Sequence, residues 1–272
     1  MSLRLTLVAL TLAGVTNYVN AQGDPLVFAI NEGITYRINP GATADRLKEV
    51  SEDLTKLLKQ PVKIQAVSDY SELAAGLAAQ RYDIAYVHPA HHSIRAMTRS
   101  GYHLLALTKG FTEYRASFMV AGNSPLKTLA ELKSLKVGAP DEDSITSVMM
   151  RASLRDAFGA QLPAITYVRL QEAVPFMVEN GFTATGVSAS RAVVKNWQDK
   201  GGKVIFTSKP VPIKHLIASD KLTEAQRTQL TAYFVSLENS VQGKKRLEGF
   251  NVTGFAEADQ RALEGLGKWL GL

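Results

Sequence analysis

Three histidines lie close together in the stretch Arg81–His92, where an apolar segment from Asp83 to Val87 is followed by His-Pro. The segment predicts a buried strand whose end leads into a helix near Ala90, an arrangement at which open α/β sheets bind ligands. The free N–H groups of that helix start favour an anion. We therefore expect His88, at the strand end, to face a ligand cleft.

The same histidines raise the question of a metal site. Adjacent His91 and His92 diverge by about 100° around a helix, so one helix face does not present both to one ion. No suitably spaced Cys, Asp or Glu completes a ligand set in the sequence. We predict no metal and no cofactor, and we expect these two side chains to be exposed or satisfied locally.

A second group of side chains suited to anion binding is Ser144, Thr146 and Ser147. They open an expected helix from Ser144 to Phe158, where free N–H groups and the positive end of the helix dipole favour a tetrahedral anion. The alternative is that Asp143 or Ser144 is only the N-cap. The acidic residues 141–143 would have to point away from a bound anion.

Signatures of catalysis are missing from the sequence. It contains no Gly-x-Ser-x-Gly, no His-Glu-x-x-His and no Gly-x-x-x-x-Gly-Lys-(Ser/Thr) motif, and no cysteine. A triad of Asp83, His88 and Ser144 would need these groups within about 3 Å of one another. We predict that the protein is not an enzyme.

Composition restricts the remaining classes. The 272 residues are 46% hydrophobic and 21% charged, which suits two folded lobes rather than a disordered chain. The net charge of +6 comes from scattered lysines and arginines, so we predict no nucleic-acid partner. The absence of cysteine excludes disulfides, thiol chemistry and a lipid-anchored cysteine.

The N-terminus is typical of a secretory signal peptide. Arg4 precedes an apolar run from Leu5 to Val15, and Val19-Asn-Ala21 matches a small-x-small cleavage pattern. The run is too short to be a stable membrane anchor. We predict a signal peptide over residues 1–21, cleavage after Ala21 and a periplasmic location.

Apolar strands alternate with helical patterns along the rest of the chain, which predicts α/β lobes with mostly parallel sheets flanked by helices. The alternation is interrupted near Tyr114–Met119 and near Ser208–His215. These interruptions indicate two crossings between lobes. We assign residues 22–114 and 213–272 to one lobe and residues 115–212 to the other, with a hinged ligand cleft between them.

In this order of elements, the motifs Tyr82-Asp-Ile-Ala-Tyr86 and Gly138-Ala-Pro-Asp-Glu-Asp-Ser-Ile-Thr-Ser147 resemble those of the phosphonate/phosphite-type periplasmic solute-binding proteins. That resemblance implies a type II periplasmic-binding fold. It also implies that aromatic side chains close over the ligand, here Tyr36 and Tyr86, although a loop surface or a core position is the alternative for each.

The resemblance also assigns positions on the second lobe and the hinge. Gln171 matches a polar ligand contact, and Arg191 and Lys214 stand where members that bind aminoalkyl phosphonates carry acids. A cation there would repel an ammonium, so we expect Arg191 to hold an anionic group. A solvated helix position is the alternative for Arg191. Arg115, at the first crossing, is a further candidate.

Taken together, these features predict a periplasmic, monomeric binding protein. It would capture a small oxyanion of phosphonate, phosphite or phosphate type and deliver it to an inner-membrane ABC permease. A ligand-sensing partner of a membrane histidine kinase or chemoreceptor is the alternative, and a periplasmic enzyme is a weaker one. The sequence does not distinguish transport from sensing.

Overall fold

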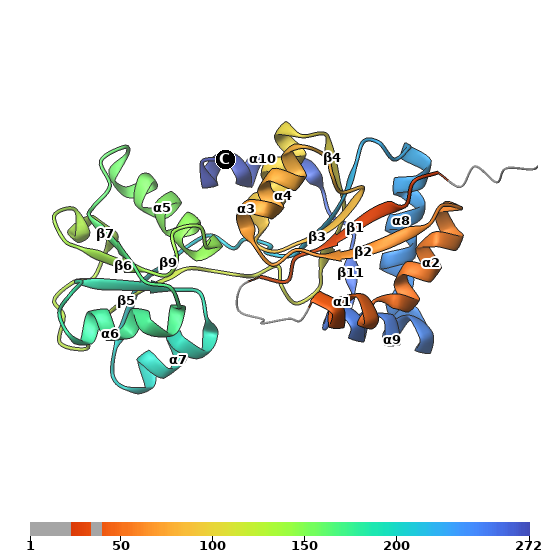
Figure 1. Ribbon diagram of the computed structural model, residues 1–272. Helices are drawn as coiled ribbons and strands as arrows, with labels where there is room; N and C mark the ends of the chain where they lie inside the picture. Colours follow the sequence, from red (N-terminus) through yellow and green to blue (C-terminus); the bar gives the residue numbers. More distant parts are fainter. Residues whose placement is uncertain (1–22, 34–39) are drawn as a thin grey trace, which may run out of the picture.

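The computed structural model describes residues 23–33 and 40–272, so the expected signal peptide and Tyr36 lie outside the described residues. The chain forms two sheets, each flanked by helices (Figure 1). We call the six-stranded sheet with its helices the first lobe and the five-stranded sheet with its helices the second lobe. The first sheet has the order β11-β4-β10-β3-β1-β2 and contains β1 (Leu26–Ile30), β2 (Val62–Ala66), β3 (Ile84–Val87), β4 (Tyr102–Thr108), β10 (His215–Ser219) and β11 (Phe255–Ala256); the second has the order β7-β6-β8-β5-β9 and contains β5 (Ser117–Val120), β6 (Val137–Ala139), β7 (Ile165–Tyr167), β8 (Thr185–Ser188) and β9 (Lys203–Thr207).

Helices follow most strands, and polar residues cap several of them. The side chains of Asp69, Ser190 and Thr223 each accept a backbone N–H at a helix start. The helices are α1 (Pro40–Arg46), α2 (Lys48–Leu58), α3 (Tyr70–Ala78), α4 (Ala90–Arg99), α5 (Ile145–Phe158), α6 (Val174–Glu179), α7 (Arg191–Asp199), α8 (Glu224–Ser236), α9 (Val241–Phe250) and α10 (Gln260–Leu270), with 3₁₀ turns η1 (Leu129–Leu132), η2 (Gln171–Ala173) and η3 (Leu237–Asn239).

Strand β3 lies in the middle of the first sheet. It pairs in parallel with β1 and in antiparallel with β10, and all four of its residues are buried. A central strand covered on both faces has a continuous apolar sequence, as Ile-Ala-Tyr-Val does here. The strand therefore holds its C-terminal end, and the His88 that follows it, in a fixed place.

Both sheets are mixed. Parallel pairing joins β2, β1 and β3 in the first sheet and β7, β6 and β8 in the second. Antiparallel pairing involves β10 and β5, the first strand after each crossing between the sheets, and also joins β11 to β4. The expected α/β architecture is confirmed, and each of its two sheets combines parallel and antiparallel strand pairs.

The chain passes between the two sheets twice, after β4 and after β9. The two crossings run side by side. Tyr114 and Val211 form an antiparallel bridge, and Ser208 donates its backbone N–H to the Ala116 carbonyl over 2.9 Å. Paired crossings of this kind are typical of a hinge. Residues 114/115 and 212/213 remain our predicted boundaries.

The C-terminal helices follow the second crossing. Helix α8 packs on β4, and α10 contacts α4 of the first lobe and α5 of the second. Arg155 and Asp156 of α5 hydrogen-bond to the Trp269 backbone carbonyl and indole N–H respectively. Helix α10 therefore connects the lobes on the side where α4 and α5 approach each other (Figure 1).

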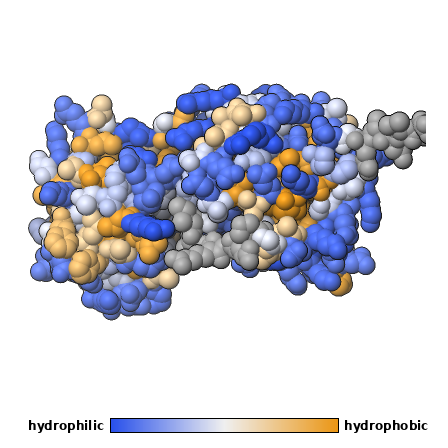
Figure 2. Space-filling model, in the orientation of Figure 1, coloured by the Kyte–Doolittle hydropathy of each residue, from blue (hydrophilic) through white to orange (hydrophobic). Residues whose placement is uncertain are grey.

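The surface seen in Figure 2 is mainly hydrophilic, with scattered apolar patches on both lobes. In the second lobe, Phe176 and Phe182 are more than half exposed and lie with ring centroids 6.0 Å apart. No helix within residues 23–33 and 40–272 is long and apolar enough to cross a membrane.

Candidate ligand-binding site between the two lobes

A pocket of about 330 Å³ lies between the lobes, at the crossings. Its walls come from the strand-end residue His88 of the first lobe, from the two crossing segments, and from η2 and the start of α7 in the second lobe. The lining residues are His88, Gly110, Phe111, Glu113, Tyr114, Gln171, Glu172, Ala189, Ser190, Arg191, Ile213 and Lys214. Four of the residues expected to bind ligand therefore line one cavity: His88, Gln171, Arg191 and Lys214.

Gln171 organises the second-lobe wall. Its Oε1 accepts the backbone N–H groups of Ala189 (2.7 Å) and Ser190 (2.9 Å) and the Ser188 hydroxyl (2.8 Å). Its Nε2 donates to the Tyr114 hydroxyl over 3.0 Å. The amide oxygen thus accepts the backbone N–H groups just before α7, and the amide nitrogen connects this turn to the first crossing.

His88 and Lys214 form the first-lobe wall. The peptide bond between His88 and Pro89 is cis, and His88 Nδ1 lies 3.0 Å from the Ile213 carbonyl oxygen. Nδ1 therefore carries the proton of a neutral ring and donates to that carbonyl. Burial lowers the pKa of His88 to about 4, so the imidazole is neutral at pH 7.

Lys214 is 5% exposed, and its ammonium lies 4.0 Å from the centroid of the Phe111 ring. Burial lowers the pKa of Lys214, while the Glu32 carboxylate opposes that change. A buried ammonium in a cavity wall attracts an anion strongly, because little water screens the interaction between the two charges.

The second-lobe charges are more exposed. Arg191 is the first residue of α7 and lines both this pocket and a neighbouring one of about 360 Å³, which Arg115 also lines. Arg115 pairs with Glu113 at 2.9 Å and donates to the Ser208 carbonyl, so it is held at the hinge. Glu172 also lines the first pocket, which therefore contains acidic as well as basic groups.

The hydroxyl cluster lies elsewhere. Ser144 is the N-cap of α5, where its oxygen accepts the Ser147 N–H over 3.2 Å. The Ser147 hydroxyl donates to the Pro140 carbonyl over 3.1 Å. Thr146 is fully buried, and its hydroxyl has no hydrogen-bond partner among the described residues. None of the three lines either interlobe pocket, and the N-cap alternative describes Ser144 as observed.

Tyr86, which the resemblance assigns to the ligand, lies in the core of the first lobe. Its side chain is fully buried in the core, with its ring centroid 5.4 Å from that of Phe250 and 6.2 Å from that of Phe255. Side chains of a strand alternate between the two sheet faces, and Tyr86 points to the face covered by the C-terminal helices. This position agrees with the core alternative for Tyr86, and the pocket lies beyond the strand end, at His88.

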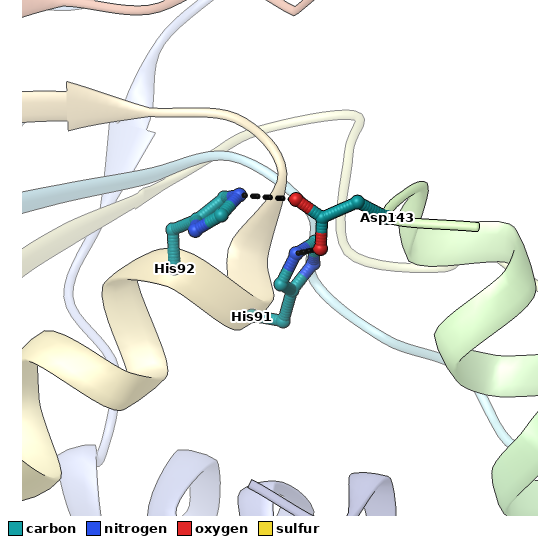
Figure 3. A group of neighbouring side chains, drawn as sticks. All are labelled: His91, His92 and Asp143. Atoms are coloured by element: carbon teal, nitrogen blue, oxygen red, sulfur yellow. Dashed lines mark hydrogen bonds and ion pairs between the residues drawn. The ribbon is translucent and has the colours of Figure 1, made fainter. Parts of the chain in front are cut away.

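His91 and His92 also differ from expectation. Both are buried rather than exposed, and their ring centroids lie 4.2 Å apart (Figure 3). The Asp143 carboxylate approaches them from the second lobe, with its oxygens 3.1 Å from His91 Nε2 and 3.6 Å from His92 Nε2. The divergence of about 100° applies to the Cβ directions, and rotation of the side chains brings the ring ends together.

Electrostatics in this cluster follow from burial. Burial lowers the pKa of His91. Burial also lowers the pKa of His92 to about 3, and the electrostatic effect of the neighbouring His91 acts in the same direction. The hydrogen bond from His91 lowers the pKa of the Asp143 carboxyl. At pH 7 the cluster therefore holds two neutral imidazoles and one carboxylate.

Two α/β lobes joined by paired crossings, with a polar pocket between them, define a ligand-binding protein of the type II periplasmic-binding fold. The sequence matches the family described as "ABC transporter, phosphonate, periplasmic substrate-binding protein" over residues 33–263. The chain belongs to this family of substrate-binding proteins of phosphonate-type ABC transporters. The family consists of non-enzymatic transport components, so the prediction that the protein is not an enzyme is confirmed.

Solved structures agree on the fold. XAC2383 from Xanthomonas citri, bound to ATP, is similar at a TM-score of 0.72 with 14% identity, over 92% of this chain and 98% of that one. PhnD1 from Prochlorococcus marinus, in complex with methylphosphonate, is similar at a TM-score of 0.60 with 18% identity, over 90% and 97%. The aliphatic sulphonate binding protein SsuA from Escherichia coli reaches 0.52 with 17% identity, over 92% and 80%. A search of curated proteins returns no match.

Proposed function

We propose that this protein captures a small oxyanion of phosphonate, phosphite or phosphate type in the interlobe pocket and presents it to an ABC permease in the periplasm. The observation that supports the proposal is the pocket, whose lining includes Lys214, next to β10 of the first sheet, and Arg191, at the start of α7. An anion can contact both cations only when the two lobes are close together. Its binding therefore favours the closed arrangement of the lobes.

The remaining wall groups suit the same ligand. The Lys214 ammonium and the Arg191 guanidinium both form charge-assisted hydrogen bonds with phosphoryl or sulfonyl oxygens, which are stronger than neutral ones. Glu113 is paired with Arg115, which reduces its repulsion of an anion. Glu172 is exposed and opens to solvent, where its charge is screened. We propose Ser144, Thr146 and Ser147 as contacts only for a more closed state, since they lie outside the pocket.

A thermal-shift screen of ligand-free protein tests the proposal. The ligands are phosphite, phosphate, methylphosphonate, aminoethylphosphonate, an alkyl sulfonate and sulfate. At a hundred times Kd, a ligand that binds only folded protein stabilises it by about 2.7 kcal/mol, which raises Tm by roughly 5–10 °C. We expect such a shift with a phosphonate or phosphite.

The control variants separate the pocket from general charge effects. Arg191→Ala should weaken the best ligand at least tenfold, while Arg261→Ala, which removes an exposed arginine of α10, should leave its affinity unchanged. A Tm that stays at the ligand-free value with each of the six anions would contradict the proposal. A response to aminoethylphosphonate alone would show instead that Glu113 or Glu172 holds an ammonium.

A further inference from the structure

The cluster of His91, His92 and Asp143 is not explained by the oxyanion pocket, which none of the three lines. The two histidines belong to the first turn of α4, in the first lobe, and Asp143 precedes the N-cap of α5, in the second. Figure 3 shows both ring ends directed at the carboxylate. The three ligand atoms lie within 4.8 Å of one another.

His92 is the unusual member. Its side chain is 3% exposed, and neither ring nitrogen has a hydrogen-bond partner among the residues described. The approach of His92 Nε2 to Asp143, at 3.6 Å, is too long for a good hydrogen bond. Burying an imidazole with both nitrogens unsatisfied is costly, so such a group points to a missing partner.

The geometry fits a metal ion as that partner. A tetrahedral Zn²⁺ with ligand bonds of about 2.0–2.1 Å places neighbouring ligand atoms about 3.3 Å apart. The observed separations from the carboxylate oxygens to His91 Nε2 and His92 Nε2, 3.1 and 3.6 Å, lie on either side of that value. Imidazole nitrogens with a carboxylate are a donor set that Zn²⁺, Ni²⁺ and Cu²⁺ accept. Asp143, with a side chain 50% exposed, leaves the site open to solvent for a fourth ligand.

We propose that His91, His92 and Asp143 form a binding site for a divalent transition-metal ion of the Zn²⁺ type that joins the two lobes. The ion replaces the His91–Asp143 hydrogen bond by coordination to both rings and the carboxylate. Because the ligands come from both lobes, the metal stabilises the arrangement in which α4 and α5 are in contact. Arg95 and Arg151 lie near enough to repel a cation, which limits the affinity.

Metal titration of tag-free protein tests the site, because a histidine tag would bind the same ions. We expect one Zn²⁺ per chain by calorimetry, and a visible cobalt(II) spectrum of the tetrahedral type. Asp143→Asn and His92→Gln should each weaken Zn²⁺ at least tenfold. The matched controls are Glu142→Gln, which removes an exposed acid from the same loop, and His103→Gln, which removes a histidine outside the cluster. Both should stay within twofold of wild type.

Two results would overturn the proposal. One is equal Zn²⁺ affinity in wild type and the His91→Gln/His92→Gln double variant. The other is loss of binding in both control variants, which would show non-specific binding. Asp143 lies on an exposed loop, so Asp143→Asn keeps the test valid even if a buried histidine variant fails to fold. The titration contains no oxyanion, so its outcome leaves the pocket proposal untouched.

Discussion

Replacing Lys214 by methionine should affect the dissociation constant of the ligand more than the free energy of unfolding. Lys214 is 5% exposed, lines the interlobe pocket and places its ammonium 4.0 Å from the Phe111 ring centroid. Methionine has similar length and flexibility and fills the same space without a charge. The Lys214→Met change therefore removes the ammonium and keeps most of the side-chain volume.

The two effects differ in size. Loss of a hydrogen bond between a charged group and an oxyanion costs about 1.5–3 kcal/mol, which raises Kd by about 10- to 150-fold. In the ligand-free protein, the variant loses the cation–π contact of about 0.5–2 kcal/mol and the attraction to the Glu32 carboxylate, while the cost of burying the ammonium is removed. Because these effects oppose one another, we expect the free energy of unfolding to change by less than about 3 kcal/mol.

Calorimetry with the oxyanion that gives the largest thermal shift measures the first effect, and urea unfolding without ligand measures the second. Lys63→Met, at an exposed position on β2, is the control for loss of one positive charge. An affinity within twofold of wild type would refute a ligand contact at Lys214. A loss of more than about 3 kcal/mol in stability would show that Lys214 mainly supports the fold.

Three further predictions concern His215, Gln171 and Tyr86. Burial lowers the pKa of His215 from 6.5 to about 4, so its contribution to stability is complete above pH 6.5 and is lost as the pH falls toward 4. Because His88 and His92 titrate over the same range, the test is a difference: urea unfolding should show His215→Gln losing up to about 3 kcal/mol less stability than wild type over that pH range. Gln171→Leu removes the acceptor of the Ala189 N–H and the nearer of two acceptors of the Ser190 N–H, and should cost about 2 kcal/mol by the same assay, whereas Gln171→Glu should cost less. Tyr86→Phe should leave oxyanion affinity within twofold of wild type by calorimetry, since the ring lies in the core; a larger loss would restore it to the site.

Sequence patterns predicted the elements that are locally encoded. The apolar run before His88 and the polar start of α5 both correspond to observed elements. The apolar spacing from Ala42 to Leu58 is typical of one helix, but the structure has two helices there, α1 and α2, interrupted at the buried Leu47. Periodicity alone did not locate that break because the apolar spacing continues through it.

Side-chain directions were less predictable. Strand alternation shows which residues share a face, but β3 is covered on both faces, so alternation does not tell which face meets a ligand. The hydrogen bonds of Gln171 depend on backbone groups of Ala189 and Ser190, and Asp143 reaches His91 from the other lobe. Such contacts depend on tertiary structure, and no local spacing in the sequence signals them.

The pocket and the His91–His92–Asp143 cluster both draw residues from two lobes, and this has a thermodynamic consequence. His88 lines the pocket and is followed within one helical turn by His91, so both sites depend on the same connection between β3 and α4. If oxyanion and Zn²⁺ each favour the arrangement with the lobes in contact, each must raise the affinity of the other by the same factor. Zn²⁺ titrations with and without saturating oxyanion measure that factor. Identical Zn²⁺ affinities would show that the two sites do not share a lobe-closure equilibrium, even if both bind.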